Sequence, residues 1–348
     1  GNGEAISIAG AFADTITNSG VITGSVAMGD GNDTLTNSGT VTGAILMGAG
    51  DDSLNLVTGA TVTGPLDGGA DNDTVNLSGA GAAALLATTG FENLVAQEGT
   101  WSVAASDYSS VTIEDGATVT STVTLNNDDE LTIEAGGALI NATTMIWTGG
   151  GDAVVDNGGL IQASSRVFNT TANAAGSFTL NNQAGGVVRG PLSPQFGAAA
   201  DATVTINNAG MMESSGRVID FQSLAAGGAD IVINNLEGGT IRQTGSNTDV
   251  IRPGQDTVVN NHGTITTAPG FAGGGDLIDY QSSTGGKVNN YATGWMEGAR
   301  HAVTGDNAVT VYNAGTMIGR NGSAVNIDNG GSEAEKVFVT NHGTMEGR

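Results

Sequence analysis

The sequence predicts an all-β solenoid, a fold in which the chain winds into stacked coils. Three observations indicate it. A segment ending in Asn and Gly recurs every 23–29 residues from Asn157 to Asn341. A related unit recurs every 19–21 residues near the start, and β-branched residues alternate with polar ones inside each unit. Repeats of this size are typical of coils that bury a core only by stacking on one another.

Composition limits what such a core can be. The chain has 348 residues with 57 Gly, 5 Pro and no Cys, and aromatic residues make up only 4%. Stacked Val, Ile, Leu, Ala and Thr must therefore fill the core, and disulfides and zinc-thiolate sites are excluded.

Charge is unevenly distributed along the chain. The formal net charge is −25, and residues 1–165 contain 20 Asp and Glu but no Lys or Arg. Because little could neutralise phosphates, we expect no nucleic-acid partner.

The repeats divide the chain into segments. Units such as DTITNSGVITG begin at Asp14, Asp33, Asp52 and Asp73, so residues 1–80 are predicted to form short coils. We expect an irregular segment at 81–110, with a helical turn at Ala82–Ala87, and short coils again at 111–150. Coils of about 26 residues follow at 151–348. The prediction is one continuous body of roughly 13–15 coils.

The recurring Asn is predicted to form a ladder at a turn, where each side-chain amide bonds the next coil and the backbone can be left-handed. Its members are Asn157, Asn182, Asn208, Asn235, Asn261, Asn290, Asn313 and Asn341. The residues predicted to face inward are Val204, Ile206, Val232, Val258, Val309 and Val337.

Several of these segments resemble a known family. TNSGTVTG, VNNHGTI, YNAGTMIG and GFENLVAQEGTWSV (Gly90–Val103) are similar to the passenger domains of bacterial autotransporters. The resemblance implies a right-handed parallel β-helix wound by a single chain, exported by type V secretion and displayed on the surface of a Gram-negative bacterium. The family's signal peptide and C-terminal membrane barrel are missing from this sequence, so we expect an excised passenger that meets the membrane only through that barrel.

Most such passengers act as adhesins or aggregation factors. The resemblance therefore implies a partner that is a cell-surface or extracellular polysaccharide or protein, or another copy of the chain. No cofactor is required for this role, and calcium is the one candidate.

The calcium candidates lie in GDGNDTL, GAGDDSL and GGADNDTV, which resemble the Ca²⁺-binding nonapeptide G-G-x-G-x-D-x-L. Stacking is expected to align Asp30, Asp51 and Asp71 with one another, beside Asp33, Asp52 and Asp73. Stacked carboxylates could hold Ca²⁺. The alternative is that they are solvated turn residues.

A second constellation lies between the Asn repeats, in the segments RVFN, RVID, DVIR, DLID, HAVT and SAVN. Their two apolar middle residues predict a local bend. Their ends form two columns, Arg166, Arg217, Asp249, Asp276, His301, Ser323 and Asn169, Asp220, Arg252, Asp279, Thr304, Asn326.

These columns allow three interpretations: a structural charge ladder, a carbohydrate-binding face or a catalytic site. β-Helical polysaccharide lyases and glycoside hydrolases use carboxylates with Arg or His, so an enzyme of this kind is the alternative to an adhesin. The catalytic candidates would be Asp220, Arg252, Asp279 and His301, and the binding candidates Arg217, Asp249, Asp276, Tyr280 and Arg300.

The remaining His and Trp residues are less informative. His262 and His342 lie in Asn-His-Gly and are predicted turn residues. Trp101, Trp147 and Trp295 are isolated in sequence, and each is expected to fill a coil end or, if exposed, to stack on a sugar ring.

Overall fold

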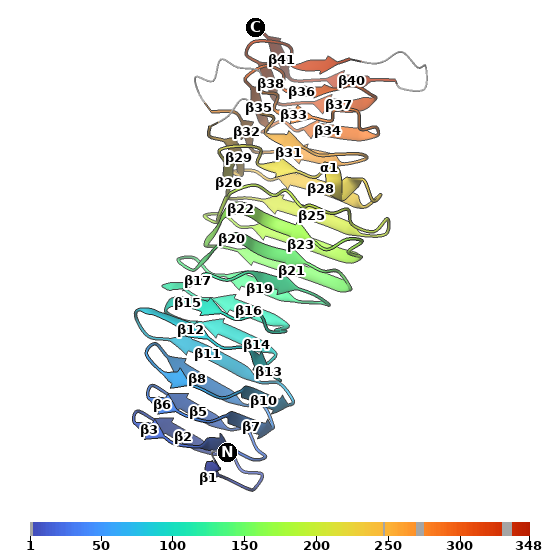
Figure 1. Ribbon diagram of the computed structural model, residues 1–348. Coiled ribbons are helices and arrows are strands. Elements are labelled where there is room, and N and C mark those ends of the chain that lie inside the picture. Colours follow the sequence, from blue (N-terminus) through green and yellow to red (C-terminus); the bar gives the residue numbers. More distant parts are fainter. Residues whose placement is uncertain (1–2, 246–247, 269–274, 329–335) are drawn as a thin grey trace. The chain divides into compact units, whose positions relative to one another are not determined.

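The computed structural model describes residues 3–245, 248–268, 275–328 and 336–348. The chain forms a right-handed parallel β-solenoid of about 14 turns (Figure 1), which confirms the predicted fold class. Among these residues, α1 (Gln222–Ala225) is the only α-helix, and no helix has the length and apolarity needed to cross a bilayer.

The chain divides into two compact units, which are described separately. Unit 1 comprises Gly1–Thr124 and Asp129–Ile140, and unit 2 comprises Leu125–Asp128 and Asn141–Arg348. The continuity of the two as one body stays a prediction.

Unit 1 winds through parallel sheets built from equivalent strands of successive coils. The first sheet contains β1 (Glu4–Ser7), β4 (Ser25–Ala27), β7 (Ile45–Ala49), β10 (Leu66–Ala70) and β13 (Thr88–Thr89). The second contains β2 (Thr15–Asn18), β5 (Thr34–Asn37), β8 (Ser53–Val57), β11 (Thr74–Ser78), β14 (Asn93–Ala96), β16 (Ser110–Ile113) and β19 (Glu130–Ile133). The others are β3 (Val21–Ile22), β6 (Thr40–Val41), β9 (Thr61–Val62), β12 (Ala82–Leu85), β15 (Gly99–Val103) and β17 (Ala117–Val119), and β18 (Val123–Leu125) and β20 (Ala138–Trp147) follow.

Unit 2 has three parallel sheets. The first contains β21 (Gly151–Asn157), β23 (Gly176–Asn182), β25 (Thr203–Asn208), β28 (Asp230–Asn235), β31 (Val258–Asn261), β34 (Gly286–Asn290), β37 (Val309–Asn313) and β40 (Phe338–Asn341). The second contains β22 (Leu160–Thr170), β24 (Val187–Arg189), β26 (Met211–Ser214), β29 (Thr240–Gln243), β32 (Thr264–Thr266), β35 (Trp295–Gly298), β38 (Thr316–Gly319) and β41 (Thr344–Gly347). The third contains β27 (Ile219–Asp220), β30 (Ile251–Arg252), β33 (Ile278–Asp279), β36 (Val303–Gly305) and β39 (Val325–Ile327).

The predicted interruption at residues 81–110 contains four strands, β12 to β15. The helical turn expected at Ala82–Ala87 is wrong, because Ala82–Leu85 is strand β12 and pairs in parallel with Thr100–Val103 of β15. Alanine favours helix, but pairing with the next coil outweighs that preference here.

In most strands every second residue is buried and contributes to the core, as a period of two requires. Aromatic rings fill part of it, since Phe168 and Phe178 stack with ring centroids 4.2 Å apart. Of the residues predicted to face inward, Val204, Ile206 and Val309 are buried, whereas Val337 is half-buried.

Two of the predicted core residues are wrong. Val204 pairs with Ile231, and that register places Val232 on the outward side of β28. Val258 likewise faces outward, and its neighbour Val259 is buried. A shift of one residue in a strand reverses the side on which every residue lies, and adjacent apolar residues hide that shift from the sequence.

The predicted Asn ladder is confirmed. In unit 2, each buried Asn donates its Nδ2 to Oδ1 of the equivalent Asn one coil later, at 2.7–2.8 Å, from Asn157 to Asn341. These Asn residues end their strands, and none has the left-handed backbone that was expected. The Asn residues of the ladder therefore have extended backbone, and their side-chain amides link one coil to the next.

A second ladder runs beside the first on the outward side of the same strands. Here Asn207 donates to Asn181 at 2.8 Å, and Asn234 donates to Asn207 at 2.8 Å. Donation runs toward the N-terminus, opposite to the buried ladder. The Asn-Asn pair therefore bonds each coil to both neighbours.

Candidate functional site

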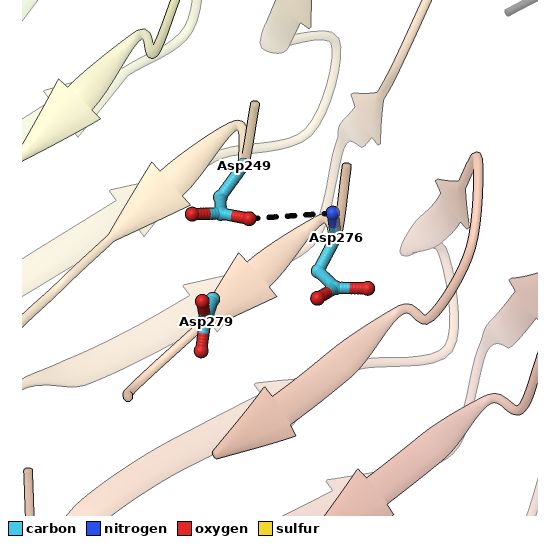
Figure 2. Close-up of side chains that lie close together, drawn as sticks. All are labelled: Asp249, Asp276 and Asp279. Atoms are coloured by element: carbon cyan, nitrogen blue, oxygen red, sulfur yellow. Dashed lines mark hydrogen bonds between the residues drawn. The ribbon is translucent and has the colours of Figure 1, made fainter. Parts of the chain in front are cut away.

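Three carboxylates of unit 2, from Asp249, Asp276 and Asp279, come together beside strands β30 and β33 (Figure 2). The segments DVIR and DLID lie in register, because Ile251 pairs with Ile278. In each segment both apolar middle residues are buried, as the predicted bend requires. Oxygens of the three carboxylates lie within 4.8 Å of one another, so the fold creates a compact acidic cluster.

Each carboxylate of this cluster accepts hydrogen bonds from the protein. Asp249 Oδ1 accepts the backbone N–H of Asp276 at 3.4 Å (Figure 2), and Asp276 Oδ1 accepts that of His301 at 3.1 Å. Asp279 Oδ1 accepts the backbone N–H of Gln281 at 2.8 Å, and the Gln281 side-chain amide also donates to Asp279. The carboxylates are thus fixed by backbone groups.

Three arginines pair with the cluster. Arg252 Nη2 lies 2.5 Å from Asp249 Oδ2 and 3.8 Å from Asp279 Oδ2. Arg217 Nε lies 3.6 Å from Asp249 Oδ2, and Arg300 forms a bidentate pair with Asp276. Arg217 also donates to Asp220 at 3.2 Å. The negative charges of four carboxylates are therefore nearly balanced by the positive charges of three guanidinium groups.

Burial and ion pairing have opposite effects on the acidity of the cluster. Burial raises the pKa of Asp279, while hydrogen bonds from Gln281 and the charge of Arg252 oppose that rise. The hydrogen bond to Asp276 raises the pKa of Arg300. Oxygen donors of this kind suit a divalent cation, but an ion would have to displace an arginine from Asp249 or Asp276.

The other predicted site residues are less available than the sequence indicates. His301 Nδ1 accepts the backbone N–H of Ser323 at 2.8 Å, so that nitrogen cannot serve as a base. Tyr280 was expected on the same face, and this is wrong: it is fully buried, with its hydroxyl 2.9 Å from the Thr257 carbonyl and 3.0 Å from that of Lys287.

One coil is missing from the predicted columns. Leu192 pairs with both Phe168 and Ile219, so the segment around it lies between Asn169 and Asp220. The later order is confirmed, because Asp220 pairs with Arg252, and Asp279 pairs with Thr304. The omitted segment, GPLSPQ, has a proline where the other segments have their first apolar residue, so it escaped recognition.

The calcium candidates of unit 1 fall into two groups. Asp33, Asp52 and Asp73 are buried and stacked, and we call them the Asp33 column. Each accepts through Oδ1 the backbone N–H of the Asp one coil earlier, at 2.7 Å. Asp73 N–H in turn donates to Glu92 at 2.8 Å. These residues are not solvated turn residues.

Burial without a cationic neighbour raises the pKa of two carboxyls of the Asp33 column, those of Asp52 and Asp73. Burial is the largest cause that raises the pKa of Asp73 to about 6, and the charges of Asp52, Glu92 and Asp51 raise it further. Burial also raises the pKa of Asp52. Asp52 and Asp73 therefore keep their protons to higher pH than ordinary Asp residues, and a nearby positive charge would stabilise their ionised forms.

The second group does not form the predicted column. Asp30 pairs with Ala11 and Ala49, whereas Asp51 accepts the backbone N–H of Asn72 at 3.1 Å and lies in a different column. Asp71 occupies a positive-φ position, at 84°, that Gly fills in earlier coils. The turns have equal length from Gly48 and from Gly69, which pair with each other, but the Asp that precedes the buried one occupies a different position in each turn.

Sequence reasoning missed a charged column on the outward side of the second sheet of unit 2. Glu213 Oε1 lies 2.8 Å from Arg189 Nε, and its Oε2 lies 2.6 Å from Arg242 Nη2. These hydrogen bonds, that of Arg242 first, lower the pKa of Glu213. Arg189 and Glu213 also line an open cavity of about 360 Å³. The signal lay in the charged residue that directly follows the pairs Val187-Val188, Met211-Met212 and Thr240-Ile241.

The three tryptophans have different environments. Trp101 and Trp147 fill the core, as expected, but Trp295 is 41% exposed on β35. Thr264 and Thr316 pair with Trp295 from the neighbouring coils. Trp295 is thus an aromatic ring on an open sheet face between hydroxyl groups.

Four rings form a surface stack that the sequence did not reveal. His262 and Tyr291 stack in parallel, with ring centroids 4.1 Å apart and planes 6° apart. Tyr312 lies 6.1 Å from Tyr291 and 5.9 Å from His342. His262 and His342 occupy turns, as predicted, and their rings also stabilise the stacking of coils.

No protein-family model, curated protein or solved structure matches the chain.

Proposed function

We propose that the chain is an extracellular adhesin of the autotransporter-passenger type, located at a bacterial cell surface, that holds extended polysaccharide on its lateral faces. The observation that carries the proposal is the exposed Trp295 on a regular sheet face. We call Trp295, Thr264, Thr316, Glu297 and Arg320 the Trp295 face. The fold is compatible with an adhesin.

The Trp295 face has the chemistry that recognises sugars. An exposed indole offers an apolar surface to the C–H face of a pyranose, while hydroxyl and charged groups bond its rim. The indole Nε1 donates to Glu297 at 3.2 Å, and Arg320 lies 3.4 Å from the same carboxylate, so the ring is oriented before a ligand arrives. Preorganisation of this kind lowers the cost of binding.

The affinity for polysaccharide comes from the repetition of outward groups along the coils. Neighbouring strands lie about 4.8 Å apart, so an extended polymer meets a new row of outward groups at each coil. Weak contacts in series give avidity without a deep pocket. The same rows could hold another copy of the chain, and self-association measured by sedimentation would identify that partner.

Trp295 also provides the test. Polysaccharide binding should shift the tryptophan emission to shorter wavelength and protect it from iodide, because the other two indoles are buried. Trp295→Phe should abolish the signal, and Trp295→Ala should weaken binding about 10-fold or more in a pull-down.

Trp147→Phe is the matched control, since it removes a buried indole and should leave both binding and the spectral change intact. Equal binding by wild type and Trp295→Ala across acidic and neutral polysaccharides would contradict the proposal.

A polysaccharide-cleaving enzyme is the second candidate, and the acidic cluster of Asp249, Asp276 and Asp279 favours it. Paired carboxylates act as acid and base in glycoside hydrolysis when both can reach the bond. Here arginines and amides occupy them, so we favour binding without cleavage.

A further inference from the structure

The Asp33 column of unit 1 has oxygen atoms without partners. Asp33, Asp52 and Asp73 are at most 2% exposed, and Oδ2 of each has no hydrogen-bond partner among the described residues. Their Oδ1 atoms are already bonded to backbone N–H groups of the preceding coil. Three buried carboxylate oxygens in a row are thus left unsatisfied, which is rare in folded proteins.

No side chain can neutralise this charge. Residues 1–165 contain no Lys, Arg or His, whereas the acidic cluster of unit 2 has three arginines. Glu92, which accepts the backbone N–H of Asp73, adds a further negative charge at the end of the column. The compensating charge has to come from solution.

Glycines allow oxygen atoms to approach closely beside the column. A Cβ built on Gly68 would lie 2.7 Å from Asp73 Oδ2 and 2.0 Å from the Gly90 carbonyl oxygen, so these two acceptors converge there. A Cβ on Gly48 or Gly69 would likewise meet the carbonyl of the preceding coil, at 1.7 and 1.8 Å. The turn therefore brings carboxylate and carbonyl oxygens together where any larger residue would separate them.

We infer that the Asp33 column binds divalent cations, with Ca²⁺ as the preferred ion. The free Oδ2 atoms of Asp33, Asp52 and Asp73 would be ligands. Beside Asp73, the carbonyl oxygen of Gly90 would be a further ligand. Ca²⁺ accepts mixed carboxylate and carbonyl oxygens in flexible geometry, whereas Mg²⁺ needs near-ideal octahedra. A cation between stacked carboxylates also removes the repulsion between neighbouring coils.

The test is the melting temperature of the protein in EDTA and in millimolar CaCl₂ at neutral pH, with calorimetric titration of CaCl₂ as a second readout. The wild type should melt at least about 5 °C higher with CaCl₂, and MgCl₂ should have a smaller effect. The triple variant Asp33→Asn, Asp52→Asn, Asp73→Asn should not respond to CaCl₂. In EDTA it should melt above the wild type, because its column is neutral.

Asp51→Asn is the matched control. It removes the same charge from an exposed neighbour of Asp52, so its response to CaCl₂ should remain. A second experiment distinguishes neutralisation by cations from neutralisation by protons. In EDTA the wild-type melting temperature should fall as pH rises from about 4 to about 6, where the folded Asp73 loses its proton, and CaCl₂ should reduce that fall.

One outcome would overturn the inference: CaCl₂ produces no heat of binding and no shift in melting temperature, while the melting temperature still falls as pH rises. Protons would then be the neutralising charge. An equal loss of response in Asp51→Asn would also overturn the inference, since the site would then be the exposed turn.

Discussion

Asn235→Ala should lower the free energy of unfolding by about 3–5 kcal/mol, whereas Asn234→Ala should cost about 1 kcal/mol or less. Asn235 is fully buried, accepts from Asn208 at 2.8 Å, and donates to Asn261 at 2.8 Å and to two backbone carbonyls. Its removal leaves buried partners without hydrogen bonds, and water cannot replace them.

Asn234 makes a matched control because it is adjacent and carries the same side chain. It also forms a ladder, with partners at 2.8 and 2.9 Å, but it is half-exposed, so water can satisfy its partners after truncation. Urea unfolding followed by circular dichroism measures both variants. Equal losses would show that the buried ladder does not hold the coils together.

Arg252→Ala should cost about 3 kcal/mol or more, because it removes the cation that the buried carboxylates of Asp249 and Asp279 share. Asp249 keeps Arg217 at 3.6 Å, whereas Asp279 has no other ion pair among the described residues. The Arg252 side chain is only 18% exposed, and those of Asp249 and Asp279 are 11% and 7% exposed. The loss should shrink on acidification as Asp279 takes up a proton, since a carboxylate with a raised pKa destabilises the fold only when it is ionised.

Arg189→Ala is the comparison for Arg252→Ala. Arg189 pairs with Glu213 at a similar distance, but its side chain is 50% exposed and Glu213 keeps Arg242. The expected cost is at most about 1 kcal/mol. A small effect of Arg252→Ala, similar to that of Arg189→Ala, would mean that the arginine does not stabilise the cluster.

The sequence predicted correctly which residues stack on one another from coil to coil. It was less reliable in predicting whether those residues face the core or the solvent. The Asn235 ladder was predictable because each coil repeats the same amide at the same point. The outward position of Val232 was not, because adjacent apolar residues fit either register. The Leu192 coil was missed for a related reason, since its proline replaces one of the paired apolar residues.

Candidate sites depend on burial, which one sequence does not reveal. The repeat spacing alone predicted that Asp249, Asp276 and Asp279 lie together. It did not predict that arginines pair with these carboxylates and so occupy them. Asp73 reads as a solvated turn residue in the sequence, yet the glycine turn buries it completely. Trp295 is exposed because its strand presents it outward, a consequence of register.

We propose that the acidic cluster of unit 2 is a structural ion-pair network in a binding protein. The most direct measurement is incubation with acidic and neutral polysaccharides, following new reducing ends and unsaturated products. We expect binding at the Trp295 face and no cleavage. Cleavage by the wild type that is lost in a folded Asp279→Asn variant would contradict the claim and assign the cluster to catalysis.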